Sequence, residues 1–335
     1  MASQTILVTG GAGYIGAVMV EVLLEHGYAV VVLDNLCHGY RDAVHPEAEF
    51  VAGDVGDLAV VSRLFAHREI HAVIHMAAHI EVGESMREPR KYFENNFARP
   101  LVLLEVMEAA GVRRFVLSST AAVYGAPEAV PIPESAPLRP VNPYGLSKLM
   151  LEQALAWHAA ARGWRYAALR YFNAAGATER CGEGHQPESH LIPLVLEAAA
   201  GERPAIAIYG RDYDTPDGTC IRDYIHVRDL AEAHVIALRR LEAPPPAACN
   251  LAAHAFNLGN GQGYSVREVI AAAERICGRK IPVQESARRP GDPARLVATA
   301  AKMQAAGWQP RQSDLEGIIA SAWRWKTRPA RRAPA

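Results

Sequence analysis

The chain has 335 residues, half of them hydrophobic, which is enough for one large α/β domain and a smaller second one. Thirty-five lysines and arginines nearly balance 36 aspartates and glutamates, leaving a formal net charge of −1. This balance argues against nucleic acid or a membrane surface as a partner, and we find no apolar run long enough to span a bilayer.

The first segment of the chain is predicted to form a strand, a glycine turn, a helix and a second strand. An apolar run from Thr5 stops at a turn that contains Gly10, Gly11, Gly13 and Gly16, and helical spacing of apolar residues begins inside that turn. Glycines let the backbone approach a pyrophosphate, and the amides of a helix N-terminus favour its negative charge. The turn therefore predicts a dinucleotide site.

The next strand, from Ala29 to Leu33, ends in Asp34. A carboxylate at this place accepts hydrogen bonds from the ribose hydroxyls of adenosine and repels a 2′-phosphate. The cofactor is therefore predicted to be NAD rather than NADP.

Strands and helices continue to alternate along the chain. The predicted helices are Leu58–His67, 91–110 with Pro100 as a kink or restart, and 144–161; the strands lie near Phe50-Val51, Ala72–Ala77, Phe115–Leu117 and Tyr166–Leu169. Such alternation predicts an α/β fold with a doubly wound parallel (Rossmann) sheet. Ligands bind at the carboxyl ends of its strands, where Asp54, Ala77 and Ser118 fall.

The character of the sequence changes beyond Gly176, where a polar loop precedes a helix at Leu191–Ala200 and mixed short elements follow. We expect residues 1–175 to form the dinucleotide-binding domain, joined by returning segments near 225–240 and 256–262. Residues 176–326 are expected to form a smaller α/β substrate domain, and 327–335 a basic, flexible tail. The cleft between the two parts is the expected substrate site.

Neither the cysteines nor the histidines predict a metal site. The five cysteines are scattered and odd in number, which favours free thiols in a reducing cytoplasm. His71, His75 and His79 are four residues apart, but the residues between the first two form an apolar run typical of a buried strand. Metal sites need convergent ligands rather than even spacing.

Tyr144 and Lys148 are the candidate catalytic residues. Four residues apart on a predicted helix, they project from the same face. A nearby ammonium stabilises the phenolate and lowers the pKa of the phenol, so the pair is suited to remove a hydroxyl proton. Thr120, which follows the fifth strand, is placed to hold the same hydroxyl.

Several motifs together resemble the extended short-chain dehydrogenase/reductase family, over about residues 5 to 326. In the first half these are Thr9-Gly10-Gly11-Ala12-Gly13-Tyr14-Ile15-Gly16, Leu33-Asp34-Asn35-Leu36, Val82-Gly83-Glu84-Ser85, Tyr144-Gly145-Leu146-Ser147-Lys148 and Arg170-Tyr171-Phe172-Asn173. The second half, with Arg222-Asp223-Tyr224-Ile225-His226-Val227 and Phe256-Asn257-Leu258-Gly259, resembles the UDP-glucose (UDP-galactose) 4-epimerases of that family.

The resemblance implies a redox-neutral reaction on bound NAD. Tyr144 would take the proton of the sugar 4-hydroxyl while a hydride passes from C4 to the nicotinamide, and the 4-keto sugar would receive the hydride back on its other face. Lys148 would also hold the nicotinamide ribose. The resemblance further implies a homodimer built on the helices at 91–110 and 144–161.

The resemblance also implies which residues line each ligand. The implied cofactor residues are Gly10, Gly13, Tyr14, Ile15, Gly16, Asp34, Asn35, Asp54, Val55, Ala77, Asn96, Ser118, Tyr144, Lys148 and Tyr171. Those implied for the UDP-sugar are Thr120, Asn173, Leu191, Ala207, Tyr209, Arg222, Arg289, Asp292 and Leu296. Guanidinium groups such as those of Arg222 and Arg289 match the oxygens of a diphosphate.

Three positions depart from the pattern of the family. Ile80 and His190 stand where some epimerases carry a lysine and an asparagine. Leu296 stands at a position beside the sugar where a tyrosine accompanies restriction to glucose and galactose, and small residues accompany acceptance of N-acetylated sugars. The UDP-sugar therefore stays open among hexose, N-acetylhexosamine, uronate and pentose.

Two other functions remain as alternatives. A nucleotide-sugar dehydratase or decarboxylase needs a further acid near the sugar, usually after the position of Thr120, and here Ala121 and Ala122 follow. A non-catalytic nucleotide sensor of this fold often lacks the tyrosine or the lysine, and this chain retains both.

Overall fold

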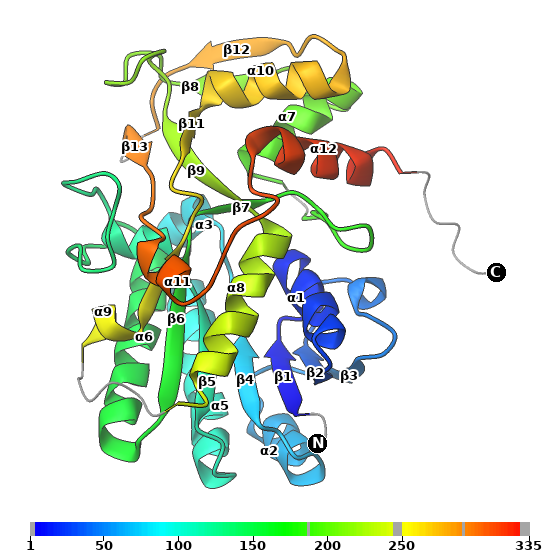
Figure 1. Cartoon of the computed structure of the whole chain (residues 1–335), viewed down its shortest axis with the longest axis vertical. Coiled ribbons are helices and arrows are strands. Elements are labelled where there is room, and N and C mark those ends of the chain that lie inside the picture. The colour runs from blue at the N-terminus through cyan, green and yellow to red at the C-terminus, as the bar shows by residue number, and fades with distance from the viewer. Residues whose placement is uncertain (1–3, 186–187, 244–249, 290–291, 329–335) are drawn as a thin grey trace.

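A computed structural model describes residues 4–185, 188–243, 250–289 and 292–328 (Figure 1). Its centre is a seven-stranded parallel sheet in the order β10-β6-β5-β4-β1-β2-β3. The strands are β1 (Thr5–Thr9), β2 (Ala29–Asp34), β3 (Glu49–Ala52), β4 (Ala72–His75), β5 (Arg114–Thr120), β6 (Arg165–Tyr171) and β10 (Ala255–Leu258). The predicted doubly wound parallel sheet is confirmed.

Helices cover both faces of this sheet, so its strands are buried on both sides and consist of nearly continuous apolar runs. In β1, Ile6 packs into the core beneath α1 (Tyr14–Glu25) and α8 (Val227–Arg240). Leu7 points to the opposite core, beneath α2 (Leu58–His67), α5 (Arg99–Ala109) and α6 (Pro143–Arg162). Figure 1 shows α1 and α8 in front of the sheet.

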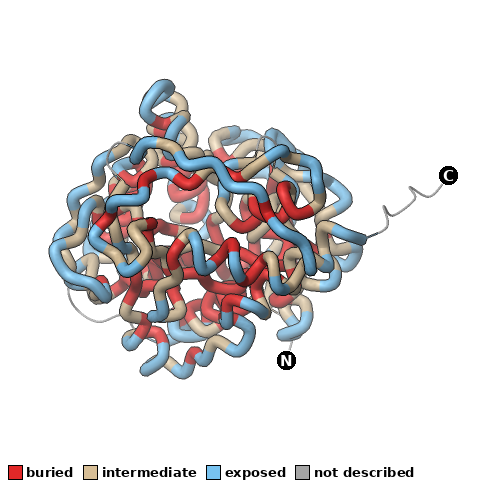
Figure 2. The backbone as a smooth tube through the Cα atoms, turned by 90° about the horizontal axis from the view of Figure 1, so that it is seen from above, coloured by how far each residue is buried: buried red, intermediate tan, exposed pale blue. Residues whose placement is uncertain are grey.

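The second part of the molecule stands on the carboxyl ends of the large sheet. It holds the strands β7 (Asn173–Ala175), β8 (Ile206–Tyr209), β9 (Ile221–His226), β11 (Gly263–Ser265), β12 (Val283–Ser286) and β13 (Arg295–Leu296). Its helices α7 (Leu191–Ala200), α10 (Val266–Cys277) and α12 (Leu315–Lys326) share a core of their own. Figure 2 shows buried chain running through the interior of the molecule, with exposed segments around it.

The remaining short elements connect these layers. They are the helices α3 (Val82–Arg87), α4 (Pro89–Phe93), α9 (Leu251–His254) and α11 (Ala301–Ala305), the 3-10 turns η1 (Arg41–Ala43) and η3 (Ala121–Tyr124), and the π-helical turn η2 (Glu94–Ala98). Among the described residues no helix is long and apolar enough to cross a membrane. Residues 329–335, most of the predicted tail, lie outside the described part of the chain.

Several strands differ in length from those predicted: β4 ends two residues earlier, and β6 is longer at both ends. The helical segment predicted over 91–110, with a kink or restart at Pro100, is observed as the end of α4, the π-helical turn η2 and α5, and Pro100 lies in the first turn of α5. Proline lacks the N–H that would continue the α-helical ladder into that segment. Strand β5 runs three residues further than predicted, since Ser118 to Thr120 pair with Leu169 to Tyr171 of β6.

The turn after β1 requires glycine for steric reasons. Gly10 has a φ of 74°, and a Cβ atom built on Gly16 would lie 2.0 Å from the carbonyl oxygen of Gly10. Real Cβ atoms do not come this close to a backbone oxygen, so α1 could start here only without a side chain at that position.

We predict that Gly16→Ala lowers the free energy of unfolding by about 1–3 kcal/mol, because the added methyl group must push the turn away from α1. Denaturant unfolding followed by circular dichroism measures this change. Gly83→Ala is the matched control, since a Cβ on Gly83 in α3 meets no heavy atom within 4 Å. Equal stability of the two variants would contradict the prediction.

Candidate active site

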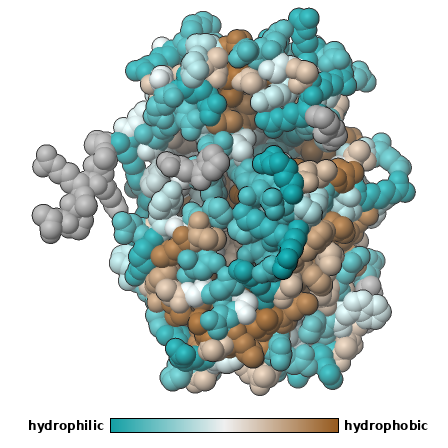
Figure 3. All heavy atoms as spheres, turned by 180° about the vertical axis from the view of Figure 1, so that it is seen from behind, coloured by the Kyte–Doolittle hydropathy of each residue, from teal (hydrophilic) through white to brown (hydrophobic). Residues whose placement is uncertain are grey.

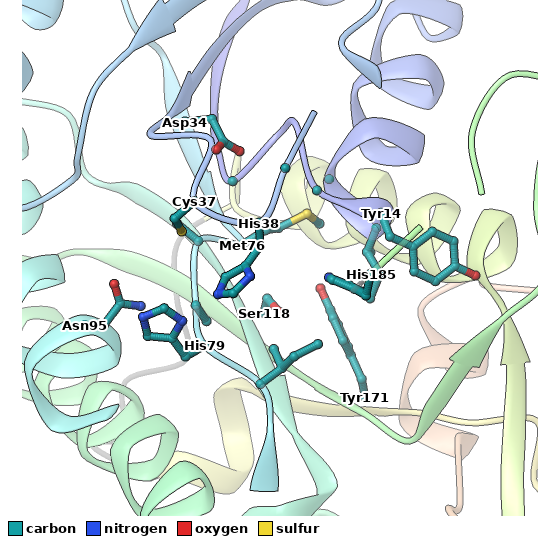
Figure 4. A pocket seen from close by; sticks show the side chains of 18 of the residues that line it. Tyr14, Asp34, Cys37, His38, Met76, His79, Asn95, Ser118, Tyr171 and His185 are labelled. Atoms are coloured by element: carbon teal, nitrogen blue, oxygen red, sulfur yellow. The ribbon is translucent and has the colours of Figure 1, made fainter. Parts of the chain in front are cut away.

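A cavity of about 360 Å³ opens at the carboxyl ends of the large sheet. Its walls come from the glycine turn, the ends of β2 to β6, and the segment that leads to α7. Figure 4 shows Asp34 at one end of the cavity, with Ser118 and Tyr171 deeper in it. This is the edge at which parallel sheets bind ligands.

Most of the predicted cofactor residues line this cavity. They are Gly10, Gly13, Tyr14, Ile15, Gly16, Asp34, Asn35, Asp54, Val55, Ala77, Ser118, Tyr144, Lys148 and Tyr171, joined by the predicted substrate residues Thr120 and Asn173. Asn96 lies outside the lining: its side chain bonds the backbone N–H and carbonyl of His79, at 2.9 Å each, and the hydroxyl of Ser147. It therefore positions the loop after β4 rather than facing the cavity.

The N-terminus of α1 fits an anionic ligand. Gly13 is the N-cap, and among the described side chains none forms a cap with it, so the first amides of the helix remain available. These free amides and the positive end of the helix dipole suit the diphosphate of a dinucleotide. The absence of a side chain at Gly16 leaves room for the close approach that such binding needs.

Asp34 is held in place by the backbone on either side of it. One carboxylate oxygen accepts a hydrogen bond from Ala12 N–H at 2.9 Å, and the other accepts from Leu36 N–H at 2.8 Å. Leu36 has a φ of 59°, a left-handed conformation that is uncommon outside glycine and here turns its amide back to the acid. Each oxygen keeps a further lone pair for a ribose hydroxyl.

Asp54 is also fixed by neighbouring donors. Its carboxylate accepts hydrogen bonds from Asn35 Nδ2 at 2.8 Å and from Arg99 Nη1 at 2.7 Å. Tyr14 lines the cavity, but its hydroxyl donates to the carbonyl of Gly176 at 2.6 Å, and its ring points away from the other labelled side chains in Figure 4. Tyr14 thus links α1 to the second part of the molecule.

The candidate catalytic residues meet at the ends of β5 and α6. Lys148 is 2 % exposed and its Nζ donates to the carbonyl of Ser118 at 2.8 Å. Burial lowers the pKa of Lys148 to about 7, against the opposing charge of Glu152. Burial raises the pKa of Tyr144, although its hydrogen bond with Thr120 opposes that rise.

The direction of the pKa shift of Tyr144 differs from the one expected from the sequence. Lys148 was expected to lower the pKa of Tyr144, but desolvation is the larger effect in the protein without ligands. A group that carries positive charge in the cavity would favour the phenolate. The protonated form of Lys148 has the same effect, which makes its charge state central to the chemistry.

His38 and His185, which lie in the cavity wall, were not singled out from the sequence. His79 was considered only in a possible metal set, and His190 only as a departure from the pattern of the family. His38 and His79 face each other edge to face with ring centroids 5.3 Å apart (Figure 4). His185 and His190 pair with Glu183 at 2.6 Å and Glu188 at 2.8 Å. These histidines come from separate loops, and no spacing within any one loop signals that they converge.

Glu183, Glu188 and His190 lie close enough together to be considered as metal ligands. Ligand atoms of Glu183, Glu188 and His190 lie within 4.8 Å of one another. Because the Nδ1 atom of His190 already pairs with Glu188, we assign no metal to them.

The remaining predicted substrate residues lie outside this cavity. They are Leu191, Ala207, Tyr209, Arg222, Arg289, Asp292 and Leu296, on or beside α7, β8, β9 and β13. Arg222 and Asp292 form an ion pair, and Leu296 pairs in register with Arg222. The guanidinium of Arg289 lies 4.0 Å from the centre of the Tyr209 ring.

Comparisons with known proteins agree with this geometry. The model of the NAD dependent epimerase/dehydratase family matches residues 6–259. A UDP-glucose 4-epimerase of Streptococcus mutans is 50% identical over 327 residues, covering 96% of each chain. The crystal structure of UDP-glucose 4-epimerase from Brucella ovis in complex with NAD has a TM-score of 0.90 at 44% identity, covering 96% of this chain and 98% of that one.

A third relative was crystallised with two ligands. The UDP-glucose 4-epimerase from Bifidobacterium longum in complex with NAD+ and UDP has a TM-score of 0.90 at 40% identity. The match covers 97% of this chain and 99% of that one.

We predict that the Lys148 ammonium titrates near pH 7 in the protein without added ligands. It would be charged below that pH and neutral above it, whereas a solvated lysine titrates near about 10.4. The chain has only five lysines, so NMR of ¹³C-labelled lysine side chains can follow each one, and Lys148→Met assigns the signal. Titration of that signal near pH 10 would contradict the prediction.

Proposed function

The chain belongs to the NAD dependent epimerase/dehydratase family, and we propose from this premise that it is an NAD-dependent UDP-glucose 4-epimerase. The observation that carries the proposal is the meeting of Tyr144, Lys148 and Thr120 in a cavity whose other end suits a dinucleotide. Bound NAD would supply the acceptor for the hydride of C4 and its return.

Side chains of this protein would then transfer the proton of the sugar 4-hydroxyl and orient its oxygen. Tyr144 is the general base for the sugar 4-hydroxyl, and Thr120, hydrogen-bonded to Tyr144, orients the same oxygen. Lys148 in its ammonium form favours the phenolate of Tyr144. When the ketone is reduced from its other face, Tyr144 returns the proton.

The two parts of the molecule would each bind a different ligand. We propose that residues 1–175, with the segments near 225–240 and 256–262, bind NAD, because their strand ends form the cavity. Residues 176–326 would mainly bind the UDP-sugar. Arg222 and Arg289 are the proposed diphosphate contacts and Tyr209 the aromatic surface beside them, supported by the UDP complex of the Bifidobacterium longum relative.

The setting proposed for this reaction is the cytoplasm. Four of the five cysteines are described, and Cys37, Cys181, Cys220 and Cys277 are free thiols. Free thiols persist in reducing compartments.

The test is to incubate the purified protein with UDP-galactose and separately with UDP-N-acetylgalactosamine, and to follow the 4-epimers by chromatography.

We predict conversion of UDP-galactose by the wild-type protein. We also predict that Tyr144→Phe retains NAD but converts UDP-galactose more slowly by about 10²-fold or more, the loss typical of a missing general base. Conversion of the second sugar as well would show that Leu296 leaves room for an acetamido group.

Two results would contradict this proposal. Near-normal activity of Tyr144→Phe would remove Tyr144 from the role of base. If neither sugar reacts with NAD supplied, epimerisation of these two sugars fails, and a UDP-uronate or UDP-pentose becomes the next substrate to test.

We also propose a homodimer, built on α5 and α6. Trp157 on α6 is 72% exposed and Leu101 on α5 is 36% exposed, and exposed apolar residues on neighbouring helices are typical of interfaces. Figure 3 views the molecule from the side of these helices and shows hydrophobic residues gathered on its lower half.

Trp157→Glu is predicted to convert the dimer to a monomer, because a carboxylate would be buried without a partner. Sedimentation velocity measures the change. Val283→Glu is the control, since Val283 is 47% exposed on β12, in the second part of the molecule and away from α5 and α6. A wild-type monomer, or a dimer that persists in Trp157→Glu, would contradict the proposed interface.

A further inference from the structure

A buried ion pair lies directly behind the catalytic residues, and the reaction proposed above does not use it. Arg170 on β6 and Glu152 on α6 have side chains that are 0% and 1% exposed. The guanidinium donates Nε to Glu152 Oε1 at 3.1 Å and Nη2 to Oε2 at 2.6 Å. Such two-point geometry is the most directional form of an arginine–carboxylate pair.

The position of Glu152 connects this pair to the catalytic residues. Tyr144, Lys148 and Glu152 are spaced four residues apart on α6, so successive turns of one helix face carry them. The carboxylate of Glu152 also accepts a hydrogen bond from the hydroxyl of Ser119. Ser119 stands in β5 between Ser118, whose carbonyl binds Lys148, and Thr120.

The same network extends to the segment beside β13. Arg170 Nη1 donates to the hydroxyl of Tyr124 at 2.8 Å, and that hydroxyl donates to Asn257 Oδ1 at 2.6 Å. Asn257 Nδ2 in turn donates to the carbonyl of Ile132 at 2.8 Å. Ile132 forms a bridge with Ala298, two residues beyond Leu296.

A buried ion pair is not in general needed for the stability of a fold. Buried ion pairs can be replaced by apolar residues of similar volume at little cost and sometimes with a gain in stability. The pair is therefore expected to act on the site rather than only on the fold.

Glu152 lies about one helical turn from Lys148 on α6, and its negative charge raises the pKa of that lysine against the larger effect of burial. The other titratable groups around Lys148 are Tyr144 on α6, Tyr171 on β6 and His75 on β4, with Arg170 behind Glu152. His75 is neutral at physiological pH because burial lowers its pKa to about 3. Burial raises the pKa of both tyrosines, so neither supplies a negative charge in the resting protein.

We propose that Glu152 is a positioning residue for the reaction: held by Arg170 and Ser119, it favours the ammonium form of Lys148 and fixes the end of β5 that presents Thr120. The inference rests on the proposed function, since Lys148 must be charged to favour the phenolate of Tyr144. Without Glu152 the charged form of Lys148 is less favourable, so Lys148 would lose its proton at a lower pH.

The experiment compares Glu152→Gln with the double variant Glu152→Gln/Arg170→Met. The single variant leaves a buried arginine unpaired and can lose its fold, whereas the double variant removes both charges. In each folded variant two quantities are measured, namely the titration of Lys148 by NMR of labelled lysine and the dependence of kcat on pH with UDP-galactose.

We expect the Lys148 titration and the alkaline limb of kcat both to move to lower pH by about one unit or more. On that limb kcat would fall about tenfold at fixed pH, because the charged fraction of Lys148 falls tenfold for each pH unit. Glu108→Gln is the matched control: it breaks pairs with Arg162 and His158 at the far end of α6, and it should leave both measurements unchanged.

Two outcomes would overturn the inference. One is an unchanged Lys148 titration in the double variant. The other is a double variant with wild-type kcat and pH dependence, which would leave the pair a purely structural role. Lack of epimerisation by the wild-type protein would instead count against the proposed function, and the NMR titration would still test the link between Glu152 and Lys148.

Discussion

The charge of Lys148 is energetically costly, because the ammonium group is 2% exposed and little solvated. The protein offsets this cost with the carbonyl of Ser118 and the nearby carboxylate of Glu152. Both partners require β5 and α6 to lie in one fixed relation. The hydrogen bond of Ser119 on β5 with Glu152 on α6 helps to hold that relation, so the ionisation of the site depends on how the helix packs on the sheet.

The elements best predicted from the sequence are those specified by local signals. Helices α2 and α7 have the predicted bounds, and α2 follows its N-cap Asp57, whose side chain accepts hydrogen bonds from the amides of Ala59 and Val60. Helix α6 begins at Pro143, the residue before its predicted start, with Asn142 as its cap. The end of β5 could not be read in this way, since Ser118 to Thr120 are polar and become strand only through pairing with β6.

The residues of the site also differ in whether local sequence signals predict them. Residues at strand ends, such as Asp34 and Ser118, were predictable because the topology of a parallel sheet brings them to one edge. Loop residues such as His38 and His185 depend on contacts between distant segments, for example the hydroxyl of Tyr40 donating to the carbonyl of Gly184 at 3.2 Å. No spacing within either loop encodes such a contact.

Strand β10 comes from late in the sequence, and this affects how the chain folds during synthesis. This edge strand reaches the large sheet from residues 255–258, and α8 reaches α1 from residues 227–240. While the ribosome is still synthesising the second half, the emerging first half has an unpaired edge at β6 and an uncovered apolar face on α1. Open edges and apolar faces of this kind favour association between nascent chains. A fragment cut after residue 175 would keep both surfaces permanently, so the dinucleotide-binding half is not a module that can be excised and expressed alone.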